Sequence, residues 1–108
     1  MSQYVELLFT FPGYKPYKVY ALYDTGCSLL LAKYGVFPPE TWQKGQTQIL
    51  SYANQQQQKV SSIAKNVMFQ LGSQTYTATF TLHDPMKYDI MLGKRLFVLN
   101  RNAGKNQK

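Results

Sequence analysis

The sequence contains few of the residues that build disulfides or metal sites. Among 108 residues there is one cysteine, Cys27, and one histidine, His83. A single cysteine excludes an intramolecular disulfide, and it also excludes the multi-cysteine zinc patterns. We therefore expect no metal and no cofactor, and the cysteine content fits a reducing compartment.

Long hydrophobic runs and targeting segments are also missing. No apolar stretch approaches the ~20 residues of a membrane span, and residues 1–3 are not followed by a basic region and a long apolar segment. The sequence thus predicts neither a membrane partner nor secretion. Because 44% of the residues are hydrophobic and 15% aromatic, we expect a folded chain rather than a disordered one, and its length favours one domain.

Acidic residues are scarce: five Asp and Glu stand against twelve Lys and Arg, a formal charge of +7. Clustered cations bind nucleic-acid phosphates by releasing counterions. Most of the cations here are spread along the chain, and only one group gathers, toward the C-terminus: Lys94, Arg95, Arg101, Lys105 and Lys108. A solvated surface is the favoured interpretation, and nucleic acid is not expected as a specific partner.

The chain does contain many short strand-like runs separated by turn residues, which predict an all-β fold. Pro12-Gly13 and Gly72-Ser73 each predict the turn of a hairpin, and the proline-containing loop 35–42 is expected to be anchored by packing of Trp42. The predicted strands are residues 3–11, 17–23 and 28–34, two runs within 47–63 around a projecting polar tip at 54–58, two runs within 66–84, and 90–92. One short helix is predicted at 94–99.

An acid interrupts the apolar sequence "YALYDTGCSLLLAKYG" at residues 20–35. A carboxylate between apolar runs is costly unless it has partners or a task. Asp24 is followed by Thr25, whose hydroxyl could lock a loop, and by Gly26, which allows a sharp turn whose N–H groups can orient the acid. The alternative, purely structural interpretation is an aspartate that caps a turn. The tripeptide alone does not decide between a catalytic and a structural aspartate.

Peptide hydrolysis needs a base to activate water and an acid to protonate the carbonyl oxygen. Two copies of Asp24 could supply both at the axis of a two-fold dimer, where a residue meets its own copy. Two adjacent carboxylates cannot both ionise easily, so they share one proton.

Each half of the chain also holds a hairpin and then an apolar strand that stops at a glycine, Gly26 or Gly93, which suggests an internal pseudo-repeat.

The flanks of the tripeptide resemble a known family. "ALYDTGCSLLLA" is similar to the active-site strand and loop of retropepsin-type aspartic proteases, and "YDIMLGKRLF" is similar to the segment that leads into their short helix. "CSLLLAKYGVFPPETW" and "LSYANQQQQKVSSIAKNVMFQLG" are most similar to the proteases of plant pararetroviruses, the caulimovirus and tungrovirus group. The resemblance covers residues 5–99.

This resemblance implies a closed acid-protease barrel that is one half of a homodimer, with residues 1–99 as the protease domain and 100–108 as a polar, basic tail. It implies that Asp24 is catalytic, that Thr25 hydrogen-bonds across the dimer and that Gly26 permits the loop. Residues 51–57 would form a flap over an extended substrate. The candidate substrate contacts in the flap are Ser51, Tyr52, Ala53, Asn54 and Gln55.

The implied function is the cleavage of a viral polyprotein, including the protease's own flanks, in the host cytoplasm or the virion. Three features depart from the family pattern. Cys27 stands where the family more often has Ala or Ser, the flap tip holds no glycine, and the end of the chain, 100–108, is polar where retroviral proteases interleave apolar strands. Because of the polar end, we expect the isolated domain either to dimerise weakly or to use another surface, such as the flaps.

Three other functions compete with this one. A cysteine hydrolase would use Cys27 as nucleophile, His83 as base and Asp84 to orient it, but a buried inert cysteine and a surface histidine are favoured. A monomeric enzyme would use Asp89 as second acid, although no Thr-Gly follows it. A non-catalytic β-barrel could bind single-stranded nucleic acid through its nine tyrosines.

Overall fold

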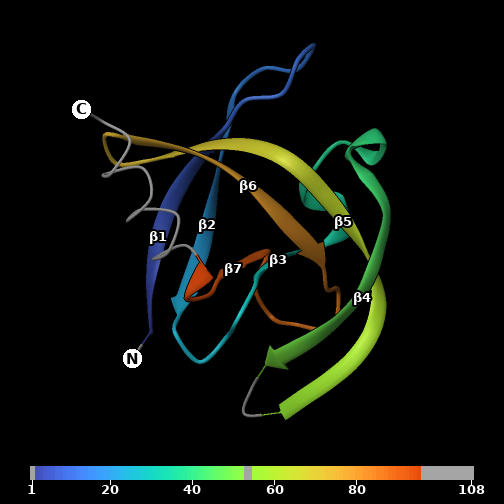
Figure 1. Ribbon diagram of the computed structural model, residues 1–108. Helices are drawn as coiled ribbons and strands as arrows, with labels where there is room; N and C mark the ends of the chain where they lie inside the picture. The colour runs from blue at the N-terminus through green and yellow to red at the C-terminus, as the bar shows by residue number, and fades with distance from the viewer. Residues whose placement is uncertain (1, 53–54, 96–108) are drawn as a thin grey trace, which may run out of the picture.

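The computed structural model describes residues 2–52 and 55–95, which form a closed six-stranded β-barrel with one additional strand (Figure 1). The strands are β1 (Ser2–Phe9), β2 (Tyr17–Asp24), β3 (Leu30–Ala32), β4 (Trp42–Tyr52), β5 (Gln55–Leu71), β6 (Gln74–Leu82) and β7 (Ile90–Leu92). Two 3-10 turns, η1 (Tyr34–Val36) and η2 (Pro39–Thr41), separate β3 from β4. The all-β prediction is confirmed, while the helix predicted at 94–99 lies, from residue 96 onward, outside the described residues.

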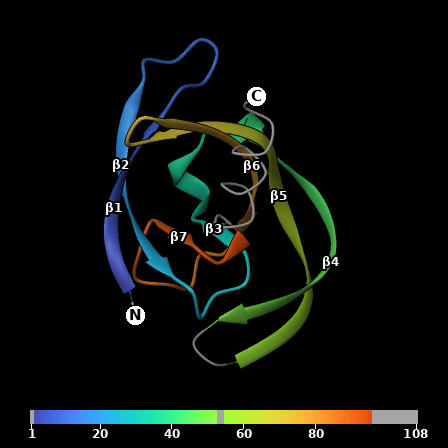
Figure 2. The same cartoon turned by 60° about the vertical axis from the view of Figure 1, so that its left-hand side comes forward.

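The barrel closes because β1 and β5, the two ends of the spatial order of its strands, pair with each other. The strand order is β1-β2-β7-β3-β6-β5, and β1 joins β5 through the pairs Leu8↔Gln70 and Phe9↔Phe69. β2 runs parallel to β7, and β3 runs parallel to β6. β4 pairs with β5 outside this ring, so the β4–β5 hairpin extends from the barrel (Figures 1 and 2).

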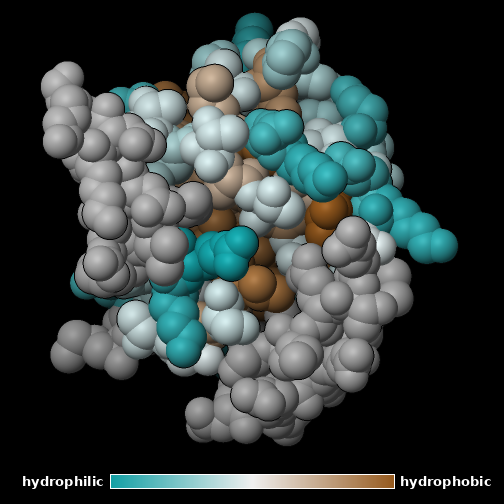
Figure 3. Space-filling model, in the orientation of Figure 1, coloured by the Kyte–Doolittle hydropathy of each residue, from teal (hydrophilic) through white to brown (hydrophobic). Residues whose placement is uncertain are grey.

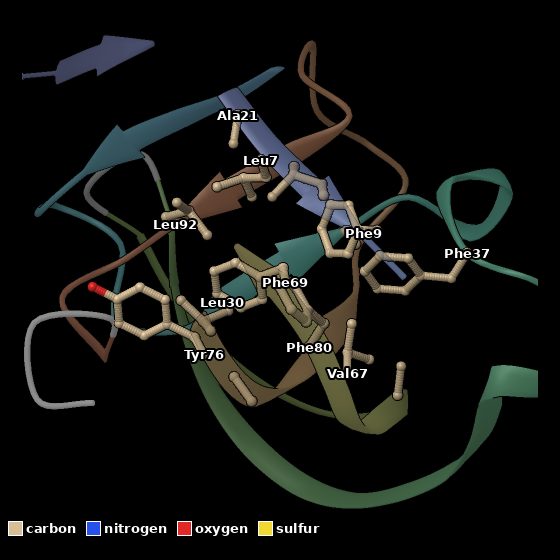
Figure 4. Close-up of a cluster of buried hydrophobic side chains, with 14 of the residues drawn as sticks. Leu7, Phe9, Ala21, Leu30, Phe37, Val67, Phe69, Tyr76, Phe80 and Leu92 are labelled. Carbon is tan, nitrogen blue, oxygen red and sulfur yellow. The ribbon is translucent and has the colours of Figure 1, made fainter. Parts of the chain in front are cut away.

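Alternate strand residues point inward and build an aromatic core around Phe9 (Figure 4). Its ring centroid lies 5.1 Å from that of Phe37, 5.7 Å from Phe69 and 6.1 Å from Phe80, within the range of favourable aromatic contacts. Trp42 stacks on Phe37 at 5.5 Å and donates its Nε1–H to the Tyr34 carbonyl at 3.0 Å. The predicted anchoring role of Trp42 is therefore confirmed.

The strand β5 differs most from the sequence prediction. Its 17 residues form one strand, because a bulge between Ala64 and Val67 absorbs the irregularity at Asn66, whose φ is 58°. The projecting hairpin predicted around residues 54–58 is present, but its tip is shorter than predicted: residues 55–58 belong to β5, and Gln55 already pairs with Tyr52. Glutamine has none of the turn-forming chemistry of Gly, Pro, Asn or Asp, so its backbone joins the β-ladder instead.

A close backbone contact joins the end of β7 to the loop after β2. The N–H of Lys94 donates to the carbonyl of Cys27 at 3.0 Å. A Cβ added to Gly93 would overlap this carbonyl oxygen and would lie 2.6 Å from that of Leu29. Both obstacles are backbone atoms, which cannot rotate away as a side chain can. Only glycine therefore fits at position 93.

We expect Gly93→Ala to lower the free energy of unfolding by about 1–3 kcal/mol or more, the usual cost of overpacking. The matched control is Gly35→Ala, because a Cβ at Gly35 meets no atom within 4 Å. Urea denaturation followed by tryptophan fluorescence measures both variants. Equal stability of the two would contradict the close contact at Gly93.

Candidate active site

The segment Asp24-Thr25-Gly26 forms a tight turn at the end of β2. The carbonyl of Asp24 accepts the N–H of Cys27 at 3.0 Å, and its carboxylate Oδ1 accepts the N–H of Gly26 at 2.9 Å. Asp24 is half-buried, whereas Thr25 and Gly26 are exposed. A Cβ on Gly26 would lie 3.1 Å from Oδ1. The turn therefore fixes the orientation of the carboxylate and presents it at the surface.

The same hydrogen bonds would satisfy an ordinary turn-capping aspartate, so the neighbouring surface has to distinguish the two roles. Strand register aligns Tyr4, Leu22, Met91 and Leu31 in one row across β1, β2, β7 and β3. Asp24 follows Leu22 by two residues and so projects from the same face of the sheet. The carboxylate thus lies beside a row of mostly apolar side chains, on the face opposite the barrel core.

Leu22, Met91 and Leu31 belong to a second cluster of buried apolar side chains, separate from the core. Figure 3 shows small hydrophobic patches among more hydrophilic side chains near the centre of the view, where Figure 1 draws β3 and β7. The buried members of this second apolar cluster are Leu22, Cys27, Leu31, Met86 and Met91, and the partly buried Leu29 and Tyr88 pack against them. The oriented carboxylate therefore lies beside tightly packed apolar side chains, of which only Leu29 and Tyr88 are partly exposed.

The β4–β5 hairpin reaches the same end of the molecule as the carboxyl end of β2 (Figures 1 and 2). Ser51 and Tyr52 lie at the end of β4, and Gln55 begins β5. Ala53 and Asn54 lie outside the described residues. The fold therefore brings the predicted flap segment to the end of the barrel that carries Asp24.

Cys27 lacks the environment of a reactive thiol. It is 1% exposed, and its Sγ–H donates to the Leu29 carbonyl at 3.2 Å. Burial raises the pKa of the Cys27 thiol, and the negative charge of Asp24 raises it further. Catalytic cysteines need the opposite, a lowered pKa and an accessible sulfur. The geometry favours the interpretation of Cys27 as a packed, inert residue.

The other two members of the alternative cysteine site have structural roles. His83 was expected at the surface, but this prediction is wrong: the residue is buried, 6% exposed. Its backbone N–H donates to the Ala32 carbonyl at 3.0 Å, which draws the segment after β6 against β3. The Asp84 carboxylate accepts the backbone N–H of Tyr34 at 2.9 Å and so ties this segment to η1.

Asp89 lies too far along the sheet to act with Asp24 in one chain. The parallel pair Tyr23↔Leu92 places Asp24 level with Gly93, four residues beyond Asp89. At ~3.3 Å per residue, this separation is about 13 Å. Two carboxylates must be in close contact to share a proton. A second acid at Asp24 would therefore have to come from another chain.

The side chains beside the site, notably Tyr4, Leu22 and Met91, were not among the predicted site residues. The Pro12-Gly13 turn could have predicted that Tyr4 lies beside Leu22, because the turn sets the register of the hairpin and this register pairs the two residues. The parallel neighbour Met91 is remote in sequence, and no local pattern reveals it.

In the described ranges 2–52 and 55–95, no group of three or more His, Cys, Asp or Glu could hold a metal ion.

No helix in the part of the chain that the structure describes is long and apolar enough to cross a membrane.

A family model described as Cauliflower mosaic virus peptidase matches residues 1–101. The "Enzymatic polyprotein" of Figwort mosaic virus (strain DxS) is 27% identical over 93 residues, which are 85% of this chain and 14% of that polyprotein. No solved structure shows significant similarity.

The family match covers nearly the whole sequence and includes both segments on which the resemblance to pararetroviral proteases rests. The closed barrel and the absence of long helices among the described residues agree with a retropepsin-like fold. This chain therefore belongs to the Cauliflower mosaic virus peptidase family, the caulimovirus group of retropepsin-like proteases.

Proposed function

We propose that this peptidase is an aspartic endopeptidase, with Asp24 as its catalytic residue. The observation that carries the proposal is the exposed turn in which the Gly26 N–H orients the Asp24 carboxylate at 2.9 Å beside a packed apolar cluster. An acid held in this way can meet a peptide bond that lies against the exposed turn. Membership of a peptidase family supplies the reaction class.

The enzyme acts as a homodimer in this proposal. One chain offers one carboxylate at the site, since Asp89 is about 13 Å away along the strands. An isologous two-fold interface would bring the two copies of Asp24 together. The exposed Thr25 is the neighbouring hydroxyl that would hydrogen-bond across the axis and hold the two turns in register.

The two carboxylates then divide the acid and base roles by sharing one proton. The ionised carboxylate accepts a proton from a water molecule, whose oxygen attacks the peptide carbonyl carbon. The protonated carboxyl donates its proton to the carbonyl oxygen, and a tetrahedral diol forms. Collapse of the diol breaks the C–N bond, with a proton delivered to the leaving amine. Each proton-transfer role contributes on the order of 10²- to 10⁴-fold.

The β4–β5 hairpin would act as the flap in this mechanism. Residues 51–55, which are Ser51, Tyr52, Ala53, Asn54 and Gln55, are the proposed contacts to an extended substrate. A strand laid beneath the hairpin gains main-chain hydrogen bonds, and closure excludes bulk water. The position of the hairpin at the Asp24 end of the barrel supports this role.

The proposed substrate is a viral polyprotein, including the segments that flank the protease. This choice is supported by the Figwort mosaic virus relative, whose name is "Enzymatic polyprotein" and of which this chain matches only 14%. Cleavage would take place in the host cytoplasm or in the virion.

We expect Asp24→Asn to lower kcat/KM by at least about 10²- to 10⁴-fold, because a general acid–base group is lost from both chains. The assay is cleavage of a proteome-derived peptide library, read by mass spectrometry. Asp89→Asn is the matched control, since this exposed acid lies outside the site, and it retains activity. Full activity of Asp24→Asn would refute the proposal.

Dimer formation has its own test. We expect the activity of dilute wild-type enzyme to rise faster than linearly with its concentration, because assembly follows mass action. An excess of Asp24→Asn protein inhibits the wild type by forming mixed dimers with one acid, whereas the same excess of inactive, unfolded protein does not. Strictly linear activity without inhibition by Asp24→Asn indicates a monomeric enzyme.

The third variant, Cys27→Ser, keeps a donor for the Leu29 carbonyl. We expect its kcat/KM to stay within about tenfold of wild type, whereas loss of a catalytic nucleophile costs on the order of 10⁶-fold. Iodoacetamide should leave native wild-type activity unchanged, because burial raises the pKa of the thiol. Inactivation by the reagent would support the cysteine mechanism instead.

A further inference from the structure

Two tyrosines form an aromatic contact at the edge of the second apolar cluster, which lies beside Asp24. The ring centroids of Tyr4 and Tyr88 are 5.7 Å apart, and the rings meet edge to face at 63°. Hydrogen bonding to Tyr88 raises the pKa of the Tyr4 hydroxyl. Tyr88 packs against the second apolar cluster, while Tyr4 is 63% exposed. This tyrosine pair therefore continues the second apolar cluster outward and leaves one ring open to a ligand.

Strand register sets the distance of the tyrosine pair from the proposed catalytic acid. Tyr4 is level with Leu22 on the neighbouring strand, and Asp24 lies two residues farther along. Two residues span ~6.6 Å and adjacent strands are ~4.8 Å apart, so the backbones of Tyr4 and Asp24 are separated by about 8 Å. The outward-pointing ring of Tyr4 extends this distance.

An extended peptide matches this spacing. Its side chains alternate, and those on one side repeat every ~6.6–7 Å. A substrate residue at the scissile bond, beside Asp24, therefore has its next same-side neighbour two positions away. That neighbour, the third residue from the scissile bond, is within reach of the tyrosine pair.

The charges around the tyrosine pair indicate which chemistry it accepts. Glu6 follows Tyr4 on the same face of β1, and its carboxylate lies 3.7 Å from the Lys18 ammonium. The exposed Lys87 and Asp89 flank Tyr88 in sequence. Positive and negative charges are balanced here, which disfavours a phosphate-rich strand. An uncharged aromatic side chain suits an open ring with an edge-to-face partner.

We propose that Tyr4 and Tyr88 determine specificity by binding an aromatic side chain at the third substrate residue from the scissile bond. This inference rests on the proposed endopeptidase function. In a two-fold dimer each chain carries one tyrosine pair, so the preference applies on either side of the cleaved bond. Tyr4 and Tyr88 are specificity residues, and the chemical step at Asp24 does not depend on them.

The test compares wild type, Tyr4→Ala, Tyr4→Phe and Tyr34→Ala in the same peptide-library digest. Tyr34→Ala is the matched control, because this tyrosine is also exposed, 48%, but lies in η1. Two synthetic peptides with Phe or Ala at the third position, built on a cleaved library sequence, then give kcat/KM values. Circular dichroism verifies that each variant is folded. We expect the Tyr4 variants to fold, because the Tyr4 side chain is exposed.

We expect wild type to prefer the Phe peptide by roughly 3- to 10-fold, the size of an aromatic side-chain contact. Tyr4→Ala should lose this preference, so that its kcat/KM for the Phe peptide falls to that for the Ala peptide, whereas Tyr4→Phe and Tyr34→Ala should keep it. A purely structural role of Tyr4 would instead lower both rates equally, which would overturn the proposal.

Two further results would also overturn it. One is a wild-type preference for Lys or Arg, or no preference, at the third position. The other is an unchanged aromatic preference in Tyr4→Ala. In either case cleavage that still requires Asp24 leaves the proposed function intact. A library that wild type and Asp24→Asn both leave uncut overturns the endopeptidase function and this inference together.

Discussion

The close backbone contact between the end of β7 and the loop after β2 is the constraint on which the site depends. Lys94 donates to the Cys27 carbonyl at 3.0 Å, and no side chain fits between the strands at Gly93. Because this contact fixes the loop immediately after Gly26, it also fixes the turn that orients Asp24. The carboxylate is thus held by backbone atoms that side-chain motion cannot displace.

The strands that carry the site serve two purposes through their two faces. Inward-pointing residues such as Ala21, Ile90 and Leu92 complete the barrel core, while Leu22 and Met91, next to them in sequence, face outward. Since side chains alternate along a strand, the stability of the core and the shape of the site are set by the same register. A one-residue slip of β2 would remove Asp24 from the site face.

Local chemistry made several features predictable. Pro12-Gly13 and Gly72-Ser73 both form the turns that the sequence indicated, because these residues favour turn conformations. The length of the tip of the β4–β5 hairpin and the continuity of β5 were predicted wrongly. A bulge at Asn66 preserves a strand that local preference would end, and the pairing partner supplies the hydrogen bonds that decide the outcome. The burial of His83 likewise follows from a contact with β3, a distant segment.

The sequence alone determined the all-β class, the turn at Asp24 and the family resemblance, since these depend on residue types within short segments. Only the tertiary structure decided what surrounds the acid. The parallel pairing of β2 with β7 joins residues about 70 positions apart along the chain. It places Met91 beside Leu22, separates Asp89 from Asp24 and aligns the apolar row that ends at Tyr4. Such neighbours arise from pairing between strands that are far apart in sequence, which no local pattern encodes.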